Sequence, residues 1–292
     1  MEYIIKNDRV SVTVSSRGGE LKRIMSSDGT DYLWRGDRQF WPGSAPHLFP
    51  FIGRLFEQRY TYSGESYPLS IHGFLKDSEM TLEEQQENHL VLRLNADEKT
   101  LECYPFNFTL KITYRLDSSS VGIGFEVTNI DEKDMPFAIG GHPGFNVPLE
   151  EGLSFEDYYL EFDSEASPSR AEPTASNLLN GRFLEYPLLE KRIIPLKHNL
   201  FDEDAIILKD TAKSVTLKSD RGRRALKVDF PDFKYIGFWH TVKSEAPFIC
   251  IEPWTSLQGY EDTIQAIDKN EDLMVIKKGE VYRNEFVITI IE

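Results

Sequence analysis

The chain has 292 residues, with 33 lysines and arginines against 48 aspartates and glutamates, so its formal charge at pH 7 is −15. This charge argues against nucleic acid or an anionic membrane surface as a partner, because both repel an acidic protein that lacks a basic patch. The densest basic stretch, Arg221–Arg224, is short and follows Asp220, so a solvated turn accounts for it. A hydrophobic content of 40% and a charged content of 28% are typical of a globular protein rather than a disordered one.

Apolar and polar residues alternate along most of the chain, which is typical of sheets with one buried and one solvated face. The alternating runs cover residues 10–14, 90–94, 110–116, 121–127, 158–162, 214–217, 226–230 and 285–291. Asp117-Ser-Ser-Ser120 separates two of these runs, which predicts an antiparallel hairpin. Helical periodicity is confined to one or two turns over Glu261–Ile267, and no repeat of fixed period is present. The pattern therefore predicts an all-β sandwich.

The organisation of the chain favours a single domain over residues 1–292. The stretch Ser164–Arg182 is rich in Ser, Pro, Ala and Asn, and strand-like sequence lies on both sides of it, so we expect a long loop within that domain. Cys103 and Cys250 each lie in apolar, strand-like sequence, which predicts two buried thiols rather than a disulfide. No signal sequence is evident, and no run approaches the roughly 18 apolar residues of a membrane helix. We expect a soluble cytoplasmic protein.

The first of four unusual segments runs from Pro46 to Leu55, and its apolar sequence with two prolines ends near Arg54. Arginine is rarely buried without a partner, so Arg54 needs an anionic or hydroxyl-rich group nearby. The alternative is an arginine that reaches solvent or a structural carboxylate.

The second segment, Ser70–Phe74, contains His72 followed by Gly73. The glycine lets the chain turn or lets another group approach closely. A histidine in this setting is a candidate ligand for substrate, and the alternative is a structural histidine with satisfied hydrogen bonds.

The third segment, Ala138–Pro148, places His142 between a glycine pair and two prolines. A strand that delivers a histidine into a corner fixed by glycine and proline suits a positioned acid or ligand.

The fourth segment, Ala246–Ser256, leads through apolar residues into Glu252. A desolvated carboxylate has a raised pKa, which brings it toward the range of a general base near neutral pH. Trp239 and Trp254 offer flat faces that can pack against the C–H surface of a sugar. The alternative is a glutamate paired structurally with a buried arginine.

Other chemistries find less support in the sequence. The six histidines show no metal-ligand spacing. There is no G-x-S-x-G elbow and no phosphate-binding glycine loop, and neither cysteine has a neighbour that would lower its pKa. The remaining candidates indicate acid–base chemistry or sugar binding, with no metal and no cofactor.

Together the four segments resemble the aldose 1-epimerase (galactose mutarotase) family, and in particular its LacX-like branch. The matching motifs are Pro-Phe-Ile-Gly-Arg54, Ile-His72-Gly-Phe, Gly-His142-Pro-Gly-Phe-Asn and Ile-Glu252-Pro-Trp. The resemblance spans essentially the whole chain. It implies a large antiparallel β-sandwich with few short helices and with the active site in an open cleft on one sheet.

The resemblance also implies roles for individual residues. Glu252 would take the proton of the anomeric hydroxyl, while His142 would give a proton to the ring oxygen. Arg54 and His72 would bind hydroxyls or polarise the ring oxygen. An aspartate that holds sugar hydroxyls corresponds to Asp204, with Asp202 as the alternative.

One departure concerns the residue before Arg54. The better-known galactose enzymes carry Asn-Arg where this chain has Gly53-Arg54. The sugar preference of those enzymes therefore does not carry over to this chain.

This assignment makes further expectations about the site. The partner would be a small sugar, bound by a monomer or a homodimer. The carboxylate of Glu252 and the imidazole of His142 would face each other across a gap the width of a pyranose. His142 must be protonated to act as the acid, and nearby carboxylates or the overall negative charge of the protein would favour that form.

Two rival functions remain on the same fold. One is a carbohydrate-binding or regulatory protein without catalysis. The other is a hexose-6-phosphate 1-epimerase, which requires cations near the cleft; candidates close to the motifs in sequence are Arg38, Arg59, Lys76 and Arg170.

Overall fold

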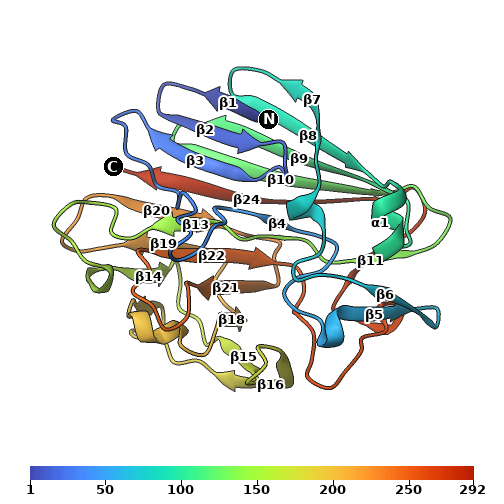
Figure 1. Ribbon diagram of the computed structural model, residues 1–292. Helices are drawn as coiled ribbons and strands as arrows, with labels where there is room; N and C mark the ends of the chain where they lie inside the picture. Colours follow the sequence, from blue (N-terminus) through green and yellow to red (C-terminus); the bar gives the residue numbers. More distant parts are fainter.

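The computed structural model describes residues 1–292 and consists mainly of antiparallel strands (Figure 1). The largest sheet has nine strands. In spatial order they are β17 (Ile193–Pro195), β14 (Tyr159–Phe162), β19 (Ser214–Lys218), β20 (Ala225–Asp229), β24 (Val281–Ile291), β10 (Ser120–Asn129), β9 (Phe108–Asp117), β8 (His89–Asn95) and β7 (Thr81–Gln85).

A second sheet of eight strands positions the candidate site. Its order is β16 (Leu179–Glu185), β15 (Ser169–Pro173), β18 (Ile206–Lys209), β21 (Tyr235–Trp239), β22 (Phe248–Trp254), β12 (Gly140–Gly141) and β4 (His47–Leu48), with β13 (Gly144–Asn146) paired to β22.

Smaller elements complete the fold. The remaining strands are β1 (Glu2–Lys6), β2 (Val10–Ser15) and β3 (Leu21–Ser26) in one sheet, and the pairs β5 (Arg59–Tyr62) with β6 (Glu65–Pro68) and β11 (Met135–Phe137) with β23 (Met274–Ile276). One α-helix, α1 (Glu98–Cys103), is joined by 3-10 turns at Phe56–Gln58, Leu75–Asp77, Phe155–Asp157, His198–Phe201 and Ile267–Lys269. No helix has the length and apolar character needed to cross a membrane. The prediction of an all-β antiparallel sandwich is confirmed.

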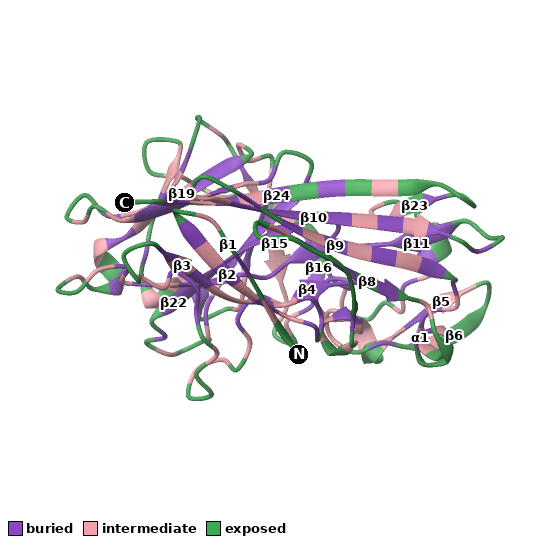
Figure 2. Cartoon of the chain, turned by 90° about the horizontal axis from the view of Figure 1, so that it is seen from above, coloured by how far each residue is buried: buried purple, intermediate pink, exposed green.

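The predicted hairpin is the longest paired unit of the nine-stranded sheet. β9 and β10 pair antiparallel from Asp117 opposite Ser120 to Phe108 opposite Asn129. Inward residues of both strands are buried and alternate with more exposed ones, which Figure 2 shows as stripes along β9 and β10. Alternation with a period of two therefore located these strands correctly.

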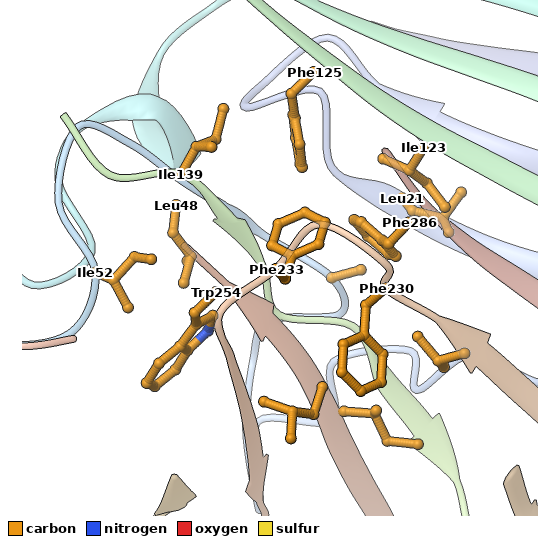
Figure 3. Close-up of a cluster of buried hydrophobic side chains, with 14 of the residues drawn as sticks. Leu21, Leu48, Ile52, Ile123, Phe125, Ile139, Phe230, Phe233, Trp254 and Phe286 are labelled. Carbon is orange, nitrogen blue, oxygen red and sulfur yellow. The ribbon is translucent and has the colours of Figure 1, made fainter. Parts of the chain in front are cut away.

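One hydrophobic cluster of 70 buried residues extends from Ile5 to Ile290 and joins the sheets. Figure 3 shows part of it, where Phe125 and Phe286 of the nine-stranded sheet lie in one cluster with Leu48 of the eight-stranded sheet. Each fully buried side chain of this size stabilises the fold by about 1.5–3 kcal/mol relative to its exposed state. The shared core supports the proposal that residues 1–292 form a single domain.

The expected loop at Ser164–Arg182 is corrected by the structure, because this stretch contains β15 and the start of β16. These strands form the edge of the eight-stranded sheet, and most side chains of β16 are exposed. An edge hairpin with little buried surface can be built from polar residues, so its sequence does not show strong alternation.

The expected helix at Glu261–Ile267 is also absent, and the only helical turn here begins at Ile267. The backbone of this stretch pairs with distant segments instead. Thr61 N–H donates to the carbonyl oxygen of Gln265 (2.8 Å), and Glu261 N–H donates to the carbonyl oxygen of Leu179 (2.8 Å). Tertiary hydrogen bonds thus replace the helical ones.

The two cysteines differ in their surroundings, although both are free. Cys250 lies in β22 and is buried, as predicted. Cys103 ends α1 and is only partly buried, so the prediction of a strand and a buried thiol is wrong there. Asp97 begins this helix with a capping box to Thr100, a local signal for a helix start.

Candidate active site

A cavity of about 770 Å³ lies beside β21 and β22 of the eight-stranded sheet. Its lining includes all seven side chains that the sequence singled out: Arg54, His72, His142, Asp204, Trp239, Glu252 and Trp254. These residues come from segments up to about 200 positions apart in the chain, so the fold is what brings them together.

Strand β22 positions Glu252 at the base of the cavity. Every residue of this strand is buried. Ile249 and Ile251 face the main core, whereas Phe248 and Cys250 belong to a second apolar cluster on the face that Glu252 shares. Burial, followed by the negative charge of Asp204, raises the pKa of Glu252 well above its usual range. The predicted desolvation of this carboxyl group is therefore confirmed.

His142 lies between β12 and β13, where its backbone N–H donates to the carbonyl oxygen of Pro46 (3.0 Å). Its ring stacks on Trp41 at a centroid distance of 4.9 Å and meets the edge of Trp239 at 5.7 Å. Burial lowers the pKa of His142 to about 4. The negative charge expected to favour a protonated His142 is outweighed here by the removal of the ring from water.

The two central groups lie side by side rather than across a gap. Nε2 of His142 is 3.2 Å from Oε2 of Glu252, so the expectation of a pyranose-wide gap between them is wrong. The two atoms do not form a hydrogen bond, and Nδ1 of His142 also has no partner. Burial favours the neutral forms of both groups, so the pair holds one transferable proton, on Glu252.

His72 is held as a neutral hydrogen-bond donor. The backbone N–H of Gly53 donates to its Nδ1 (3.1 Å), which leaves the ring proton on Nε2. Burial, then the charges of His142, Lys76 and Arg54, lower the pKa of His72 well below its usual value. Its ring meets the ring of His142 edge-on at 5.3 Å.

The backbone around His72 explains the glycine after it. Gly73 has φ +72°, and a Cβ there would lie 2.2 Å from the carbonyl oxygen of Phe49. His72 itself has φ +65°, in a region that non-glycine residues seldom occupy. Asp204 shares this property with φ +73°, so two polar residues of the cavity are held in strained backbone conformations.

Arg54 and Asp204 form a loose ion pair at the cavity, with Nη1 and Oδ2 3.7 Å apart. The arginine side chain is 43% exposed, so both groups remain accessible to a ligand. Asp202 lies instead in a separate hollow with His198 and Lys243. Of the two candidate aspartates, only Asp204 therefore lines the cavity.

Three tryptophans contribute to the lining, and sequence reasoning missed one of them. Trp41 contacts His142 and meets Trp239 edge-on at 5.6 Å. Trp41 lies in a Phe-Trp-Pro-Gly run just before the first motif, and an aromatic residue in such a turn-forming run was the one sequence feature that could have identified it. Nε1 of Trp254 is buried without a hydrogen-bond partner, which makes it a free donor beside Glu252.

The sequence also missed Arg17, Glu20, Asp77 and Gln258, which line the cavity. They lie in turns and loops without periodic signals. Arg17 forms an ion pair with Asp77 at 2.7 Å, and Lys76 pairs with the same carboxylate.

The four cations close to the motifs divide into two groups. Arg38 and Lys76 line the cavity. Arg59 pairs with Glu57 at 2.6 Å and Arg170 with Glu203 at 4.0 Å, and neither arginine lines the cavity.

One cluster near the cavity has the composition of a metal site. One ligand atom each from His142, Cys250 and Glu252 lies within 4.8 Å of the others, and all three residues are buried. No other group of three such residues has this arrangement.

Comparison with known proteins agrees with the motifs. The Aldose 1-epimerase family profile matches residues 1–289. Protein LacX of Lactococcus lactis subsp. lactis, in plasmid and chromosomal forms, is 34% identical over the full length of both chains.

Solved structures give the same result for the fold. A galactose mutarotase related enzyme from Lactobacillus acidophilus superimposes with a TM-score of 0.95 at 28% identity, covering 99% of this chain and 97% of the other. A galactose mutarotase-like protein from Lactobacillus casei gives 0.93 at 29% identity, covering 99% and 100%. The profile match and the full-length similarity together show that the chain belongs to the aldose 1-epimerase family.

Proposed function

We propose that the protein is an aldose 1-epimerase that interconverts the α and β anomers of a hexose. The observation that carries the proposal is the contact between Nε2 of His142 and Oε2 of Glu252 at the cavity. In a cyclic sugar, the anomeric hydroxyl oxygen and the ring oxygen are bonded to the same carbon. An acid and a base that serve these two oxygens must therefore lie next to each other, as this pair does.

The reaction needs one proton removed and one supplied. The carboxylate of Glu252 takes the proton of the anomeric hydroxyl, and the imidazolium of His142 gives its proton to the ring oxygen. The bond between C1 and the ring oxygen breaks, which leaves an open-chain aldehyde. Rotation about C1–C2 and the reverse transfers then give the other anomer, so the proton count of the protein is unchanged over a cycle.

The resting protonation state is compatible with this cycle. The free pair holds its proton on Glu252, and transfer to His142 across 3.2 Å produces the carboxylate and imidazolium that start the reaction. The buried Nε1–H of Trp254 lies beside Glu252 and favours its carboxylate form, which lowers the pKa of Glu252 against the larger effect of burial. Because the roles reverse for the return reaction, a pair that shares one proton suits both directions.

The remaining residues bind and orient the sugar. The Nε2–H of His72 and the guanidinium of Arg54 donate to hydroxyls or the ring oxygen, and Asp204 accepts from hydroxyls. Trp41 and Trp239 offer flat faces to the C–H surface of the ring. In this scheme the side chains of Glu252 and His142 carry out all proton transfers.

The test follows anomer interconversion by proton NMR or polarimetry in weak buffer over a panel of hexoses. Glu252→Gln and His142→Asn should lose the activity. Glu245→Gln, an exposed carboxyl in the loop before β22, is the matched control and should retain it. Wild-type rates no faster than those of the two site variants would refute the proposal. Tight sugar binding by calorimetry without interconversion would favour a non-catalytic carbohydrate-binding protein.

A second candidate is epimerisation of a hexose 6-phosphate. It is favoured by the cations Arg38 and Lys76 at the cavity, since Arg38 has no carboxylate partner while Lys76 is already paired. Glucose and glucose 6-phosphate should be compared as substrates of the wild type and of Arg38→Ala. A preference for the phosphate that Arg38→Ala removes would select this candidate, and equal use of both sugars would reject it.

A further inference from the structure

Cys250 is a buried group that the proposed reaction does not use. It lies two residues before Glu252 on β22, so both side chains leave the strand on the same face. Its sulfur lies within 4.8 Å of a ring nitrogen of His142 and a carboxylate oxygen of Glu252. Three different ligand types thus meet beside the cavity, which His142 and Glu252 line.

The polar atoms of this cluster are not satisfied within the protein. Oε2 of Glu252 and Nδ1 of His142 are buried and form no hydrogen bond, and Glu252 is only 1% exposed. Buried polar atoms without partners are uncommon and indicate a missing ligand or a chemical role. The thiol of Cys250 is likewise free of any disulfide.

We propose that His142, Cys250 and Glu252 form an inhibitory binding site for Zn²⁺. Sulfur, imidazole nitrogen and carboxylate oxygen are the three ligand types that zinc uses in proteins, and three protein ligands leave a fourth position open to water. Tetrahedral bonds of about 2.0–2.3 Å place ligand atoms about 3.3–3.7 Å apart. Nε2 of His142 and Oε2 of Glu252 are 3.2 Å apart, close to this separation, and a shift of about 1 Å brings in the thiol.

Charge balance supports a divalent cation at this position. Zinc displaces the proton of the Cys250 thiol and the proton of the Glu252 carboxyl, and it binds a neutral imidazole. The two anionic ligands cancel the charge of the ion, so the buried cluster is neutral with and without metal. A buried site that stays neutral avoids the large desolvation penalty of an isolated charge.

Occupation by zinc would stop the proposed reaction, because the ion uses the same atoms that transfer protons. Inhibition should therefore be competitive with sugar and reversed by a chelator. Metal binding itself does not depend on the epimerase proposal, so it is measured without a sugar.

The primary experiment titrates Co²⁺, a spectroscopic substitute for Zn²⁺, into the full-length protein after treatment with a chelator. We expect one equivalent to bind with the thiolate-to-cobalt charge-transfer absorption of a Co–S bond, and Zn²⁺ to remove that absorption. Calorimetry in buffers of different ionisation enthalpy should show proton release on zinc binding.

Cys250→Ser tests the assignment, with Cys103→Ser as the matched control. Cys250→Ser should lose the charge-transfer absorption and weaken zinc binding by at least about tenfold, whereas Cys103→Ser should keep both. Inhibition of each variant is scored against its own metal-free rate. If Cys250→Ser fails to fold, anomalous diffraction from a zinc-soaked wild-type crystal decides whether the ion lies between these three side chains.

The outcomes separate this inference from the proposed function. No charge-transfer absorption in the wild type, or unchanged zinc binding in Cys250→Ser, overturns the metal site and leaves the epimerase proposal intact. Cobalt binding with the expected absorption but no anomer interconversion supports the metal site and overturns only the epimerase.

Discussion

Two buried histidines, His47 on β4 and His142 just after the neighbouring strand β12, occupy different regions of the molecule. His47 of β4 is the register partner of Gly141, the residue before His142. In the core region, Nε2–H of His47 donates to the hydroxyl of Tyr114 (2.6 Å), which in turn donates to the carbonyl oxygen of Gly19 (2.5 Å). In the cavity region, Nε2 of His142 lies against a carboxyl group without a hydrogen bond.

Burial alone does not distinguish these two regions. It lowers the pKa of His47 to about 3 and the pKa of His142 to about 4. The difference lies in what surrounds each ring. The proton of His47 is committed to a chain that ends in the backbone, whereas His142 faces a titratable partner and an open volume. We therefore propose that His142 rather than His47 is the functional histidine, because only His142 can exchange a proton with a neighbouring carboxyl group and with a ligand in the cavity.

The largest expected effect concerns the cavity region. His142→Asn and Glu252→Gln should each lower the rate of anomer interconversion by about 100- to 10,000-fold, the range of general acid–base catalysis. The same substitution in the core region, His47→Asn, should leave the rate per folded molecule unchanged. The rates are measured by proton NMR at a temperature where both histidine variants are folded. Equal losses of rate in His142→Asn and His47→Asn would contradict a catalytic role that is specific to His142.

The acid dependence of the rate sharpens the comparison. The pair of His142 and Glu252 works with one proton, so kcat/KM should fall by about tenfold per pH unit below pH 4, where His142 also becomes charged. On the alkaline side, the rate should fall only as Glu252 loses its proton, at a pH raised by its burial. Initial rates between pH 3 and 10 provide the test. An acid limb near 6.5 would contradict a buried, neutral His142.

Substitution of His47 in the core region should lower the stability of the protein. His47→Asn leaves the hydroxyl of Tyr114 without its donor and should lower the free energy of unfolding by about 1–3 kcal/mol. The pKa of His47 is lower in the folded than in the unfolded chain, so the unfolded chain binds more protons between about pH 6.5 and 3. Wild-type stability therefore falls as the pH drops through this window, and the fall should be shallower in His47→Asn. Urea unfolding at several pH values measures both effects, and parallel curves would be the contrary result.

A second pair of like residues gives the smallest expected effect. Asp204 lines the cavity and Asp202 does not, although they are two positions apart. Asp204→Asn should raise KM by about tenfold through the loss of charge-assisted hydrogen bonds to sugar hydroxyls. Asp202→Asn should leave KM unchanged. Steady-state kinetics on the preferred hexose measure both values, and a larger rise of KM in Asp202→Asn than in Asp204→Asn would contradict the prediction.

The sequence predicted elements best where each strand has one buried and one exposed face. The β9–β10 hairpin meets that condition, but the polar edge strands β15 and β16 do not, so their sequence predicts a loop. The local periodicity of segment 261–267 predicts a helix, and its actual pairing with Thr61 involves a partner that is remote in sequence.

The candidate site shows a similar division. The motifs around His142 and Glu252 predicted residues that the structure brings together in one cavity, because glycine and proline fix the backbone there. Trp41 lies in an irregular loop, and the contact between the two titratable groups arises because both strands that flank His142, β12 and β13, pair with β22. The protonation state of His142 followed from its burial, which nearby sequence does not reveal.

Gly53 constrains which side chains can stand next to Arg54 at the cavity. A Cβ at this position would lie 2.4 Å from Cβ of Gln258, so the glutamine occupies the volume that a side chain at 53 would need. Backbone conformation is not the obstacle, since asparagine tolerates the φ of +67° found here. The carboxamide of Gln258 therefore lies directly beside Gly53, with its oxygen 2.6 Å from where a Cβ at position 53 would be. Exchange of sugar preference by design therefore requires a coordinated replacement, in which Gly53→Asn is introduced together with Gln258→Ala.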